Sequence, residues 1–156
     1  MKVLLVAVGK VRGNLSDAVA DFEVRAGRYW KLEVVEVAAG GPGRNAGPEA
    51  VKEAEAERIL SRVPAHFEVV ALTREGRGMN SRELADYLEG HAVQSSPGVA
   101  FVIGGAFGLH STVRARARRA MSLSTMTFPH EMARLFLAEQ LYRAGTILRG
   151  EPYHKG

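Results

Sequence analysis

The chain contains no cysteine, and this absence excludes disulfide bridges, thiolate metal sites and cysteine nucleophiles. The same absence suits a reducing compartment. No stretch approaches the roughly 18 consecutive apolar residues that a membrane-spanning helix needs. The apolar run at residues 3–8 is too short for a secretory signal, and Lys10 and Arg12 restore charge directly after it. We therefore expect a cytoplasmic protein.

Motifs for phosphate and metal binding are also missing. There is no Walker A sequence, which excludes a P-loop, and the glycine spacing does not match the dinucleotide pattern G-x-G-x-x-G. His130-Glu131 lacks the second histidine of a zinc-protease motif, and the remaining histidines are scattered along the chain. We expect no metal site. A Ser-His-Asp hydrolase triad has no fixed order along a sequence, so that alternative stays open.

What is present has the composition of one globular domain, which we expect to span residues 1–156. Apolar residues make up 46% and charged residues 24% of the chain, without internal repeats or a linker. The net charge of +4 is unevenly placed: residues 1–109 hold 13 basic and 14 acidic residues, whereas residues 110–156 hold 8 and 3. This excess favours a polyanionic partner near the C-terminal third, although charge alone does not distinguish RNA, DNA or a solubility device.

Apolar runs that alternate with helix-like stretches predict an α/β fold, with a mainly parallel sheet flanked by helices. We expect strands at residues 2–9, 32–38, 67–73, 99–103 and 121–124. Helices are expected at residues 14–29, 48–62, 80–88, 111–119 and 131–147. Asn14 is the expected N-cap of the first helix, and Asn80 with Glu83 predicts a capping box on the third.

The last helix is apolar around most of its circumference, apart from a narrow strip formed by Arg134, Glu139, Gln140 and Arg143. Such a helix must be covered on more than one side. Either a second subunit or deep burial within the monomer satisfies this requirement.

Four further features allow both a functional and a structural interpretation. Gly104-Gly105 follows a strand and suits close approach of a ligand, or simply a tight turn. Residues 122–130 alternate hydroxyl and apolar side chains, which suits a polar ligand or helix capping. The tail residues Tyr153 and His154 are able to contact a base, or form a frayed end. The fourth feature is a group of four arginines, which offers a broad cationic surface for phosphate or a solvated helix face: Arg114, Arg116, Arg118 and Arg119.

In combination, these features resemble the RlmH family along the whole chain. The resemblance rests on Leu72, Gly104-Gly105, residues 124–130, residues 141–144 and the closing Tyr153-His154. Members of this family are small SPOUT-class methyltransferases of bacterial large-subunit ribosomal RNA. The resemblance implies a homodimer and a trefoil knot within about residues 99–147, which is an exception to the rule that chains avoid knots.

The resemblance also implies S-adenosyl-L-methionine as methyl donor, without a metal. The residues implied to bind this donor are Leu72, Gly104, Gly105, Ser124, Thr125, Met126, Thr127, Phe128 and Pro129. The implied reaction is methylation of N3 of a pseudouridine in 23S ribosomal RNA on the assembled ribosome. The nearest alternative is a SPOUT enzyme that acts on another RNA, such as transfer RNA. A non-catalytic ribosome-binding protein is a third hypothesis, and a nucleotide-binding enzyme is disfavoured by the missing phosphate motifs.

For the acceptor base, the resemblance implies Arg143, Tyr153 and His154. Arg143 would stabilise charge that develops on the base, Tyr153 would stack on it, and His154 would orient the imide or relay its proton. One departure from the family concerns Ala106-Phe107, where some members carry Pro-Glu. A mechanism that uses a carboxylate at that position as proton acceptor therefore fails in this chain.

Overall fold

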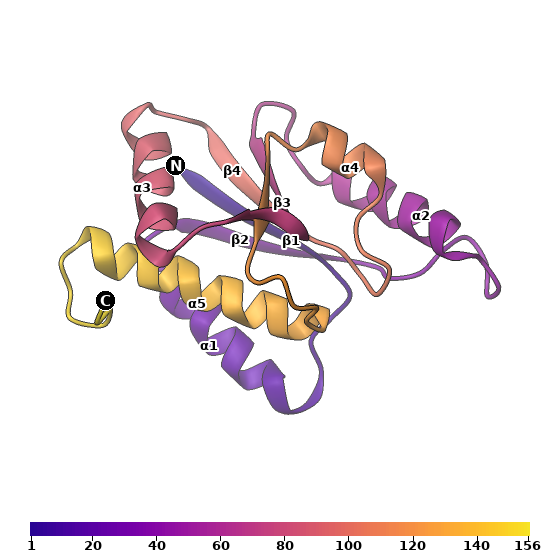
Figure 1. Cartoon of the computed structure of the whole chain (residues 1–156), viewed down its shortest axis with the longest axis horizontal. Coiled ribbons are helices and arrows are strands. Elements are labelled where there is room, and N and C mark those ends of the chain that lie inside the picture. Colours follow the sequence, from indigo (N-terminus) through magenta and orange to yellow (C-terminus); the bar gives the residue numbers. More distant parts are fainter.

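The computed structural model describes residues 1–156 and contains one five-stranded sheet in the order β2-β1-β4-β3-β5 (Figure 1). All pairings between these strands are parallel. The predicted α/β class is confirmed, and the sheet is entirely rather than mainly parallel. The strands are β1 (Lys2–Val8), β2 (Lys31–Val37), β3 (Glu68–Gly78), β4 (Gly98–Ile103) and β5 (Arg119–Ser122).

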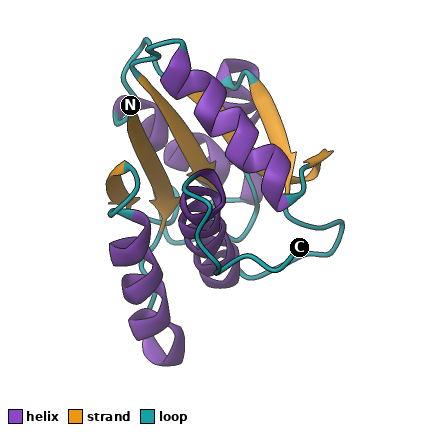
Figure 2. Ribbon diagram, turned by 90° about the vertical axis from the view of Figure 1, so that its left-hand side faces the viewer, coloured by secondary structure: helices purple, strands orange, loops and turns teal.

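Helices cover both faces of the sheet, as Figure 2 shows. One face carries α1 (Ser16–Ala26), α3 (Ser81–Val93) and α5 (His130–Leu148), and the other carries α2 (Pro48–Ser61) and α4 (Ser111–Arg116). Strands β1 and β4 are buried on both sides, which explains why they read as unbroken apolar runs in the sequence. Because helices cover both faces of the sheet, a ligand has access to the sheet at the ends of its strands.

The start of α1 differs from the prediction. Asn14 is not its N-cap, because residues Gly13–Leu15 form a short 3-10 helix and the cap position falls on Leu15 without a side-chain hydrogen bond. The helix also ends at Ala26 rather than near residue 29. The chain turns there into β2, and the indole Nε1 of Trp30 donates a hydrogen bond to the carbonyl oxygen of Leu141 at 2.9 Å. A tertiary contact thus overrides the helical pattern.

The third helix begins as predicted. The side chain of Asn80 accepts a hydrogen bond from the Glu83 N–H, and the Glu83 carboxylate accepts one from the Asn80 N–H, both at 2.8 Å. These reciprocal bonds form a capping box and satisfy two backbone donors at the helix start. The prediction from residues 80 and 83 is confirmed.

Strand β3 is longer than predicted and makes an irregular pair with β5. Its register shifts so that Met121 pairs with both Leu72 and Arg77, and the residues between them bulge outward. Gly76 sits tightly against β5, because a Cβ atom there would lie 2.7 Å from the carbonyl carbon of Ala120. The bulge carries residues 73–75 to the carboxyl edge of the sheet, where the candidate site lies.

Helix α4 ends at Arg116, three residues earlier than predicted, and Arg119 already belongs to β5. The guanidinium of Arg116 donates to the carbonyl oxygens of Ala65 and Phe67 at 3.0 and 2.9 Å. The four arginines are therefore not one helical surface, since Arg116 holds backbone carbonyls and the guanidinium of Arg119 lies over the ring of Tyr87 at 4.5 Å.

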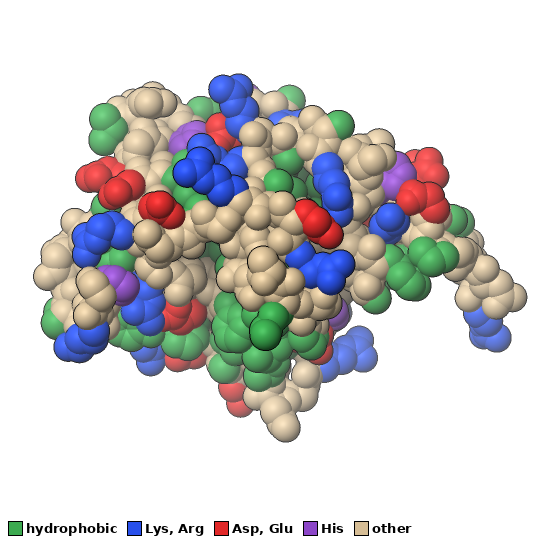
Figure 3. All heavy atoms as spheres, in the orientation of Figure 1, with side chains coloured by type: hydrophobic (Ala, Val, Ile, Leu, Met, Phe, Trp, Pro, Cys, Tyr) green, Lys and Arg blue, Asp and Glu red, His purple; other side chains and the backbone are tan.

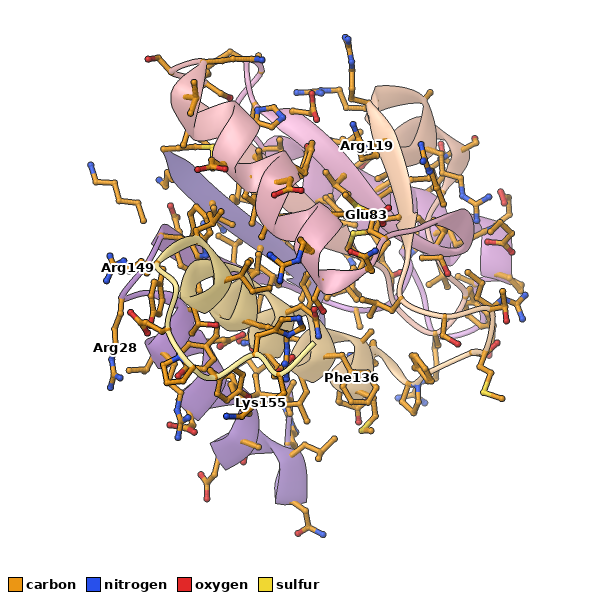
Figure 4. The ribbon with its side chains drawn as sticks, turned by 60° about the vertical axis from the view of Figure 1, so that its left-hand side comes forward. Arg28, Glu83, Arg119, Phe136, Arg149 and Lys155 are labelled. Atoms are coloured by element: carbon orange, nitrogen blue, oxygen red, sulfur yellow. The ribbon has the colours of Figure 1, made fainter.

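Helix α5 is covered largely within the monomer, by α1 and α3. Its residues Leu137, Leu141 and Ala144 are fully buried. Even Arg134, from the polar strip, is buried and pairs with Glu23 at 2.8 Å and Glu36 at 2.5 Å. Phe136 lies on the side of α5 away from the sheet (Figure 4). None of the helices combines the length and apolarity that crossing a bilayer requires.

Candidate active site

A cavity of about 310 Å³ lies where β3, β4 and β5 end. Three segments meet around it: the end of β3, the turn that follows β4, and the loop between β5 and α5. Its volume suits a small organic molecule, for which pockets of about 300–1,000 Å³ are usual. The carboxyl edge of a parallel sheet is also where such folds commonly bind ligands.

Most of the residues expected to contact the methyl donor line this cavity. The lining includes Leu72, Gly104, Gly105, Ser124, Met126, Thr127 and Phe128. Thr125 and Pro129 lie in the same loop but do not line the cavity. The fold thus joins a glycine turn, a loop that begins 19 residues after Gly105, and the end of β3 around one space.

The glycine turn after β4 is required by its own backbone. Gly108 has a φ of +84° and donates its N–H to the carbonyl oxygen of Gly105 at 3.0 Å. A Cβ on Gly104 would lie 2.8 Å from the carbonyl carbon of Gly108, and one on Gly105 would lie 3.1 Å from the carboxylate oxygens of Glu55. A side chain at position 104 would clash with the backbone of the turn, and one at position 105 would require the Glu55 carboxylate to shift. The turn therefore presents bare backbone to the cavity.

The loop between β5 and α5 is held by local hydrogen bonds. The Ser122 hydroxyl donates to the Ser124 carbonyl oxygen at 2.7 Å, and the Met126 N–H donates to the Ser124 hydroxyl oxygen at 3.0 Å. Phe128 packs edge-on against Phe136, with ring centroids 5.4 Å apart. The loop ends at Pro129, which is the N-cap of α5. It therefore offers hydroxyl groups and apolar side chains from a fixed backbone.

Charged residues at the cavity were missed by the sequence analysis. Arg74 and Glu75 come from the bulge in β3, and Arg114 comes from α4. The residue pattern gives no sign of the bulge, and the strand predicted from that pattern ends at residue 73, before the two charged residues. Arg114 was noted only as one of four arginines. His130, at the start of α5, also lines the cavity and contacts the Glu131 carboxylate at 3.2 Å.

The three residues expected to meet the acceptor base form a second cluster. Arg143 Nη1 lies 3.0 Å from His154 Nδ1, and the Arg143 guanidinium lies 4.8 Å from the ring centroid of Tyr153. Both Arg143 and the Tyr153 hydroxyl bond to Glu139, at 2.5 and 3.0 Å. The tail that carries Tyr153 and His154 turns back along α5, which carries Arg143 (Figure 4). None of the three lines the cavity of the same chain.

In this second cluster the pKa of Arg143 is raised by Glu139, and the pKa of Tyr153 is raised by burial and by Glu139. Its hydrogen bond raises the pKa of Arg143, so the guanidinium is a permanent cation. Burial, followed by the hydrogen bond to Glu139, raises the pKa of Tyr153. The phenol is therefore neutral and donates a hydrogen bond to the carboxylate. The cluster presents one fixed cation and one neutral aromatic ring.

The parallel α/β sheet with a small-molecule cavity at its carboxyl edge defines the general class: an α/β protein that binds a small organic ligand at the ends of its strands. The absence of phosphate-loop motifs separates it from the P-loop proteins. Comparison with known proteins gives the family. The family model described as "Predicted SPOUT methyltransferase" matches residues 1–154. A protein of Gemmatimonas aurantiaca named "Ribosomal RNA large subunit methyltransferase H" is 51% identical, covering 99% of this chain and 100% of its own length. A protein of the same name from Syntrophotalea carbinolica is 46% identical, with 99% of each chain covered.

Solved structures show the same fold. A probable methyltransferase from Bordetella pertussis Tohama I superposes with a TM-score of 0.59 at 21% identity, covering 92% of this chain and 95% of that one. A probable methylase family protein from Haemophilus influenzae Rd KW20 gives a TM-score of 0.55 at 12% identity, covering 99% of this chain and 70% of that one. The chain belongs to the SPOUT methyltransferases and, within them, to the ribosomal RNA large subunit methyltransferase H (RlmH) family.

Membership of a methyltransferase family implies S-adenosyl-L-methionine as methyl donor. The cavity fits such a molecule in three respects. Its volume suits a ligand of this class, the Gly104-Gly105 backbone is bare, and the lining combines apolar side chains with hydroxyl groups. An adenosine moiety needs apolar walls and backbone hydrogen-bonding groups, and both are present.

Proposed function

We propose that this chain transfers a methyl group from S-adenosyl-L-methionine to N3 of a pseudouridine in 23S ribosomal RNA on the assembled ribosome. Two relatives of nearly identical length and 51% and 46% identity are named as methyltransferases of large-subunit ribosomal RNA. The structural observation that carries the proposal is the single cavity shared by the Gly104-Gly105 turn and residues 124–128. A ribosomal substrate also implies that the protein acts in the cytoplasm.

In this proposal the cavity residues bind and orient the donor, which supplies a methyl group on a positively charged sulfur. Leu72 and Phe128 provide apolar walls, and the turn at Gly105 provides backbone groups. Thr125 and Pro129 belong to the same loop without lining the cavity, and we propose that they complete the donor site. Because the methyl group is already activated, alignment of donor and acceptor is the main task of the protein.

The second cluster is proposed to contact the acceptor base. Arg143, held as a cation by Glu139, stabilises negative charge that develops on the imide when N3 loses its proton. The neutral ring of Tyr153 stacks on the base. Arg143 can only donate to His154 Nδ1, so the proton of a neutral imidazole lies on Nε2. A ring in this state orients the imide by donating from Nε2 and does not accept its proton.

We further propose a homodimer in which the tail of one copy completes the cavity of the other. This arrangement follows from the separation of the acceptor cluster from the cavity within one chain. Apolar side chains also gather over the middle of α5, toward α1, on the face shown in Figure 3. Size-exclusion chromatography with light scattering should give a dimer mass. A monomer with full activity would contradict the arrangement.

Residues 1–156 are proposed to form one domain that contains a trefoil knot within about residues 99–147. The continuous sheet supports a single domain. The placement of β5 beside β3, with β4 on the other side of β3, is the feature on which a knot of the last segment would be built. One cooperative unfolding transition would support the single domain, and two transitions that are both independent of protein concentration would exclude it.

Mass spectrometry of ribosomal RNA tests the proposed reaction. Ribosomes, extracted 23S RNA and transfer RNA are incubated with the protein and the donor, and pseudouridine is examined for the mass increase of one CH2 group that replacement of a hydrogen by a methyl group produces. Modification of assembled ribosomes is the expected result. Modification of transfer RNA instead would favour the alternative SPOUT activity. A protein that binds ribosomes but gives no heat with the donor would be a binding module rather than an enzyme.

The role of His154 is tested separately with His154→Ala. If the ring orients the imide, turnover on ribosomes falls while the Kd of the donor is nearly unchanged, because His154 is assigned to the acceptor base and does not line the donor cavity of its own chain. His154→Gln, which retains a hydrogen-bond donor, should recover part of the lost rate. Unchanged turnover of His154→Ala would remove the residue from the chemistry.

A further inference from the structure

The charged side chains of the cavity lie together on one part of its rim. Only Arg74, Glu75 and Arg114 among its lining residues are charged, and both arginines lie within 4 Å of the Glu75 carboxylate. Their side chains are 58%, 60% and 51% exposed, which places them at the mouth of the cavity. Basic and acidic side chains meet in this area between α4 and α5 on the face in Figure 3. The rest of the lining is apolar or neutral.

The two guanidinium groups are not saturated by their carboxylate neighbour. Arg74 Nη2 lies 3.7 Å and Arg114 Nη2 lies 3.9 Å from the carboxylate oxygens of Glu75. Both distances are too long for hydrogen bonds. Arg74 makes one bond, from Nη1 to the Thr127 hydroxyl oxygen at 2.8 Å. Most N–H donors of the pair are therefore free to bind another anion at the same place.

The arrangement of charges matches an α-amino acid group. Such a group carries a carboxylate and an ammonium on the same carbon atom, so its binding site needs cationic and anionic side chains side by side. Two arginines bind a carboxylate well because guanidinium groups offer paired donors in a plane. Glu75, between them, is the partner for the ammonium. The mouth of the cavity also suits a charged group, because burial of charge is costly.

On this basis we propose that Arg74, Glu75 and Arg114 form the subsite for the amino-acid end of the methyl donor, with the arginines on its carboxylate and Glu75 on its ammonium. The inference rests on the proposed use of S-adenosyl-L-methionine. The adenosine end then occupies the apolar part of the cavity, between Leu72 and the loop at residues 123–128. Binding of the carboxylate would also connect three segments: the bulge in β3, helix α4, and the loop between β5 and α5, whose Thr127 already accepts a hydrogen bond from Arg74.

Calorimetric titration with three related ligands tests the subsite. S-adenosyl-L-methionine carries both charged groups, its decarboxylated form lacks only the carboxylate, and 5′-methylthioadenosine lacks the whole amino-acid end. The unchanged protein should bind the full donor about ten-fold more tightly than the decarboxylated form, as expected for charge-assisted hydrogen bonds near water. In Arg74→Gln and Arg114→Gln this ratio should fall toward one. Binding of 5′-methylthioadenosine should stay the same in both variants.

Two further variants sharpen the comparison. Glu75→Gln should weaken the binding of S-adenosyl-L-methionine and of its decarboxylated form, which both carry the ammonium, and leave the binding of 5′-methylthioadenosine unchanged. Arg44→Gln removes an exposed arginine from the loop between β2 and α2, outside the cavity, and serves as the charge-matched control with unchanged binding of all three ligands.

Each other outcome overturns the subsite in a recognisable way. If Arg74→Gln and Arg114→Gln keep the ten-fold ratio, the carboxylate lies elsewhere. If they raise only the KM for ribosomes at unchanged donor Kd, the arginines contact RNA phosphates instead of the donor. If the unchanged protein binds neither the full donor nor 5′-methylthioadenosine, the proposed methyl donor is wrong as well, and that result differs from a failure of the subsite alone.

Discussion

Replacement of Arg134 by methionine tests the ion-pair network that fastens α5 to the rest of the molecule. The Arg134 guanidinium bonds to Glu23 on α1 at 2.8 and 3.1 Å, and to Glu36 on β2 at 2.5 Å. These contacts raise the pKa of Arg134 despite the opposing effect of burial, so the side chain is a cation at any accessible pH. Methionine has a similar length and leaves both carboxylates without their partner.

The expected loss of stability follows from the burial of the three side chains. Their exposures are 8% for Arg134, 15% for Glu23 and 34% for Glu36. Breaking a buried ion pair from one side costs about 3–5 kcal/mol, because the remaining charge is uncompensated. Since Glu36 still reaches water, we expect the lower end, about 3 kcal/mol. For a chain of this size that corresponds to a decrease in Tm of about 6–12 °C.

The single tryptophan provides the assay. Trp30 donates its indole hydrogen bond to the Leu141 carbonyl oxygen on α5, so its fluorescence reports the docking of this helix. Urea titrations of each variant are compared at one protein concentration, since a dimer's stability depends on concentration. Lys2→Met, which breaks an exposed pair between β1 and β2, should leave the midpoint nearly unchanged.

A triple variant distinguishes two contributions to the loss of stability: the lost ion pairs of Arg134, and the cost of leaving the two carboxylates without a partner. Adding Glu23→Gln and Glu36→Gln to Arg134→Met removes both uncompensated carboxylates and should recover about half of the lost free energy of unfolding. A loss below about 1 kcal/mol in the single variant would refute the reasoning, because it would mean that the network is no stronger than a surface ion pair.

Three further predictions concern other contacts. Gly145→Ala places a Cβ atom 2.6 Å from Cβ of Tyr29, and the resulting overpacking should cost about 1–3 kcal/mol in the free energy of unfolding; full stability would show that Tyr29 moves aside freely. Asn80→Ala removes one half of the capping box and should cost about 1 kcal/mol in the same titration, whereas Asn80→Ser should cost less. Burial, and then the hydrogen bond to Glu68, raises the pKa of Tyr87 well above the ordinary value of about 10, so the stability that its neutral form contributes is present below that pH and is lost as the pH rises further. Unfolding titrations between about pH 9 and 11 should therefore show a shallower alkaline decrease for Tyr87→Phe, and an identical slope would contradict the raised pKa.

Apart from Leu72, which only the family resemblance supplied, the candidate site was accessible from the sequence where its residues form short contiguous motifs. Gly104-Gly105 directly follows an apolar strand, and residues 124–128 form one run of hydroxyl and apolar side chains, so both were identified before the fold was known. The resemblance to the RlmH family, confirmed by relatives that match over nearly the whole chain, placed them in one pocket. Arg74 and Glu75 were missed because a bulge, not a periodic pattern, turns them toward the cavity.

The sequence by itself determined the succession of strands and helices, the parallel α/β class and the family, because hydrophobic periodicity and short motifs are local properties of the chain. The tertiary structure decided where the charges lie. In the folded chain Arg134 is buried between two carboxylates, Arg116 donates hydrogen bonds to backbone carbonyl oxygens, and Arg114 lies at the mouth of the cavity. The sequence alone does not distinguish these three arginines. The reason is physical: the environment of a charged side chain depends on segments that fold against it from distant parts of the chain, and no local pattern encodes that encounter.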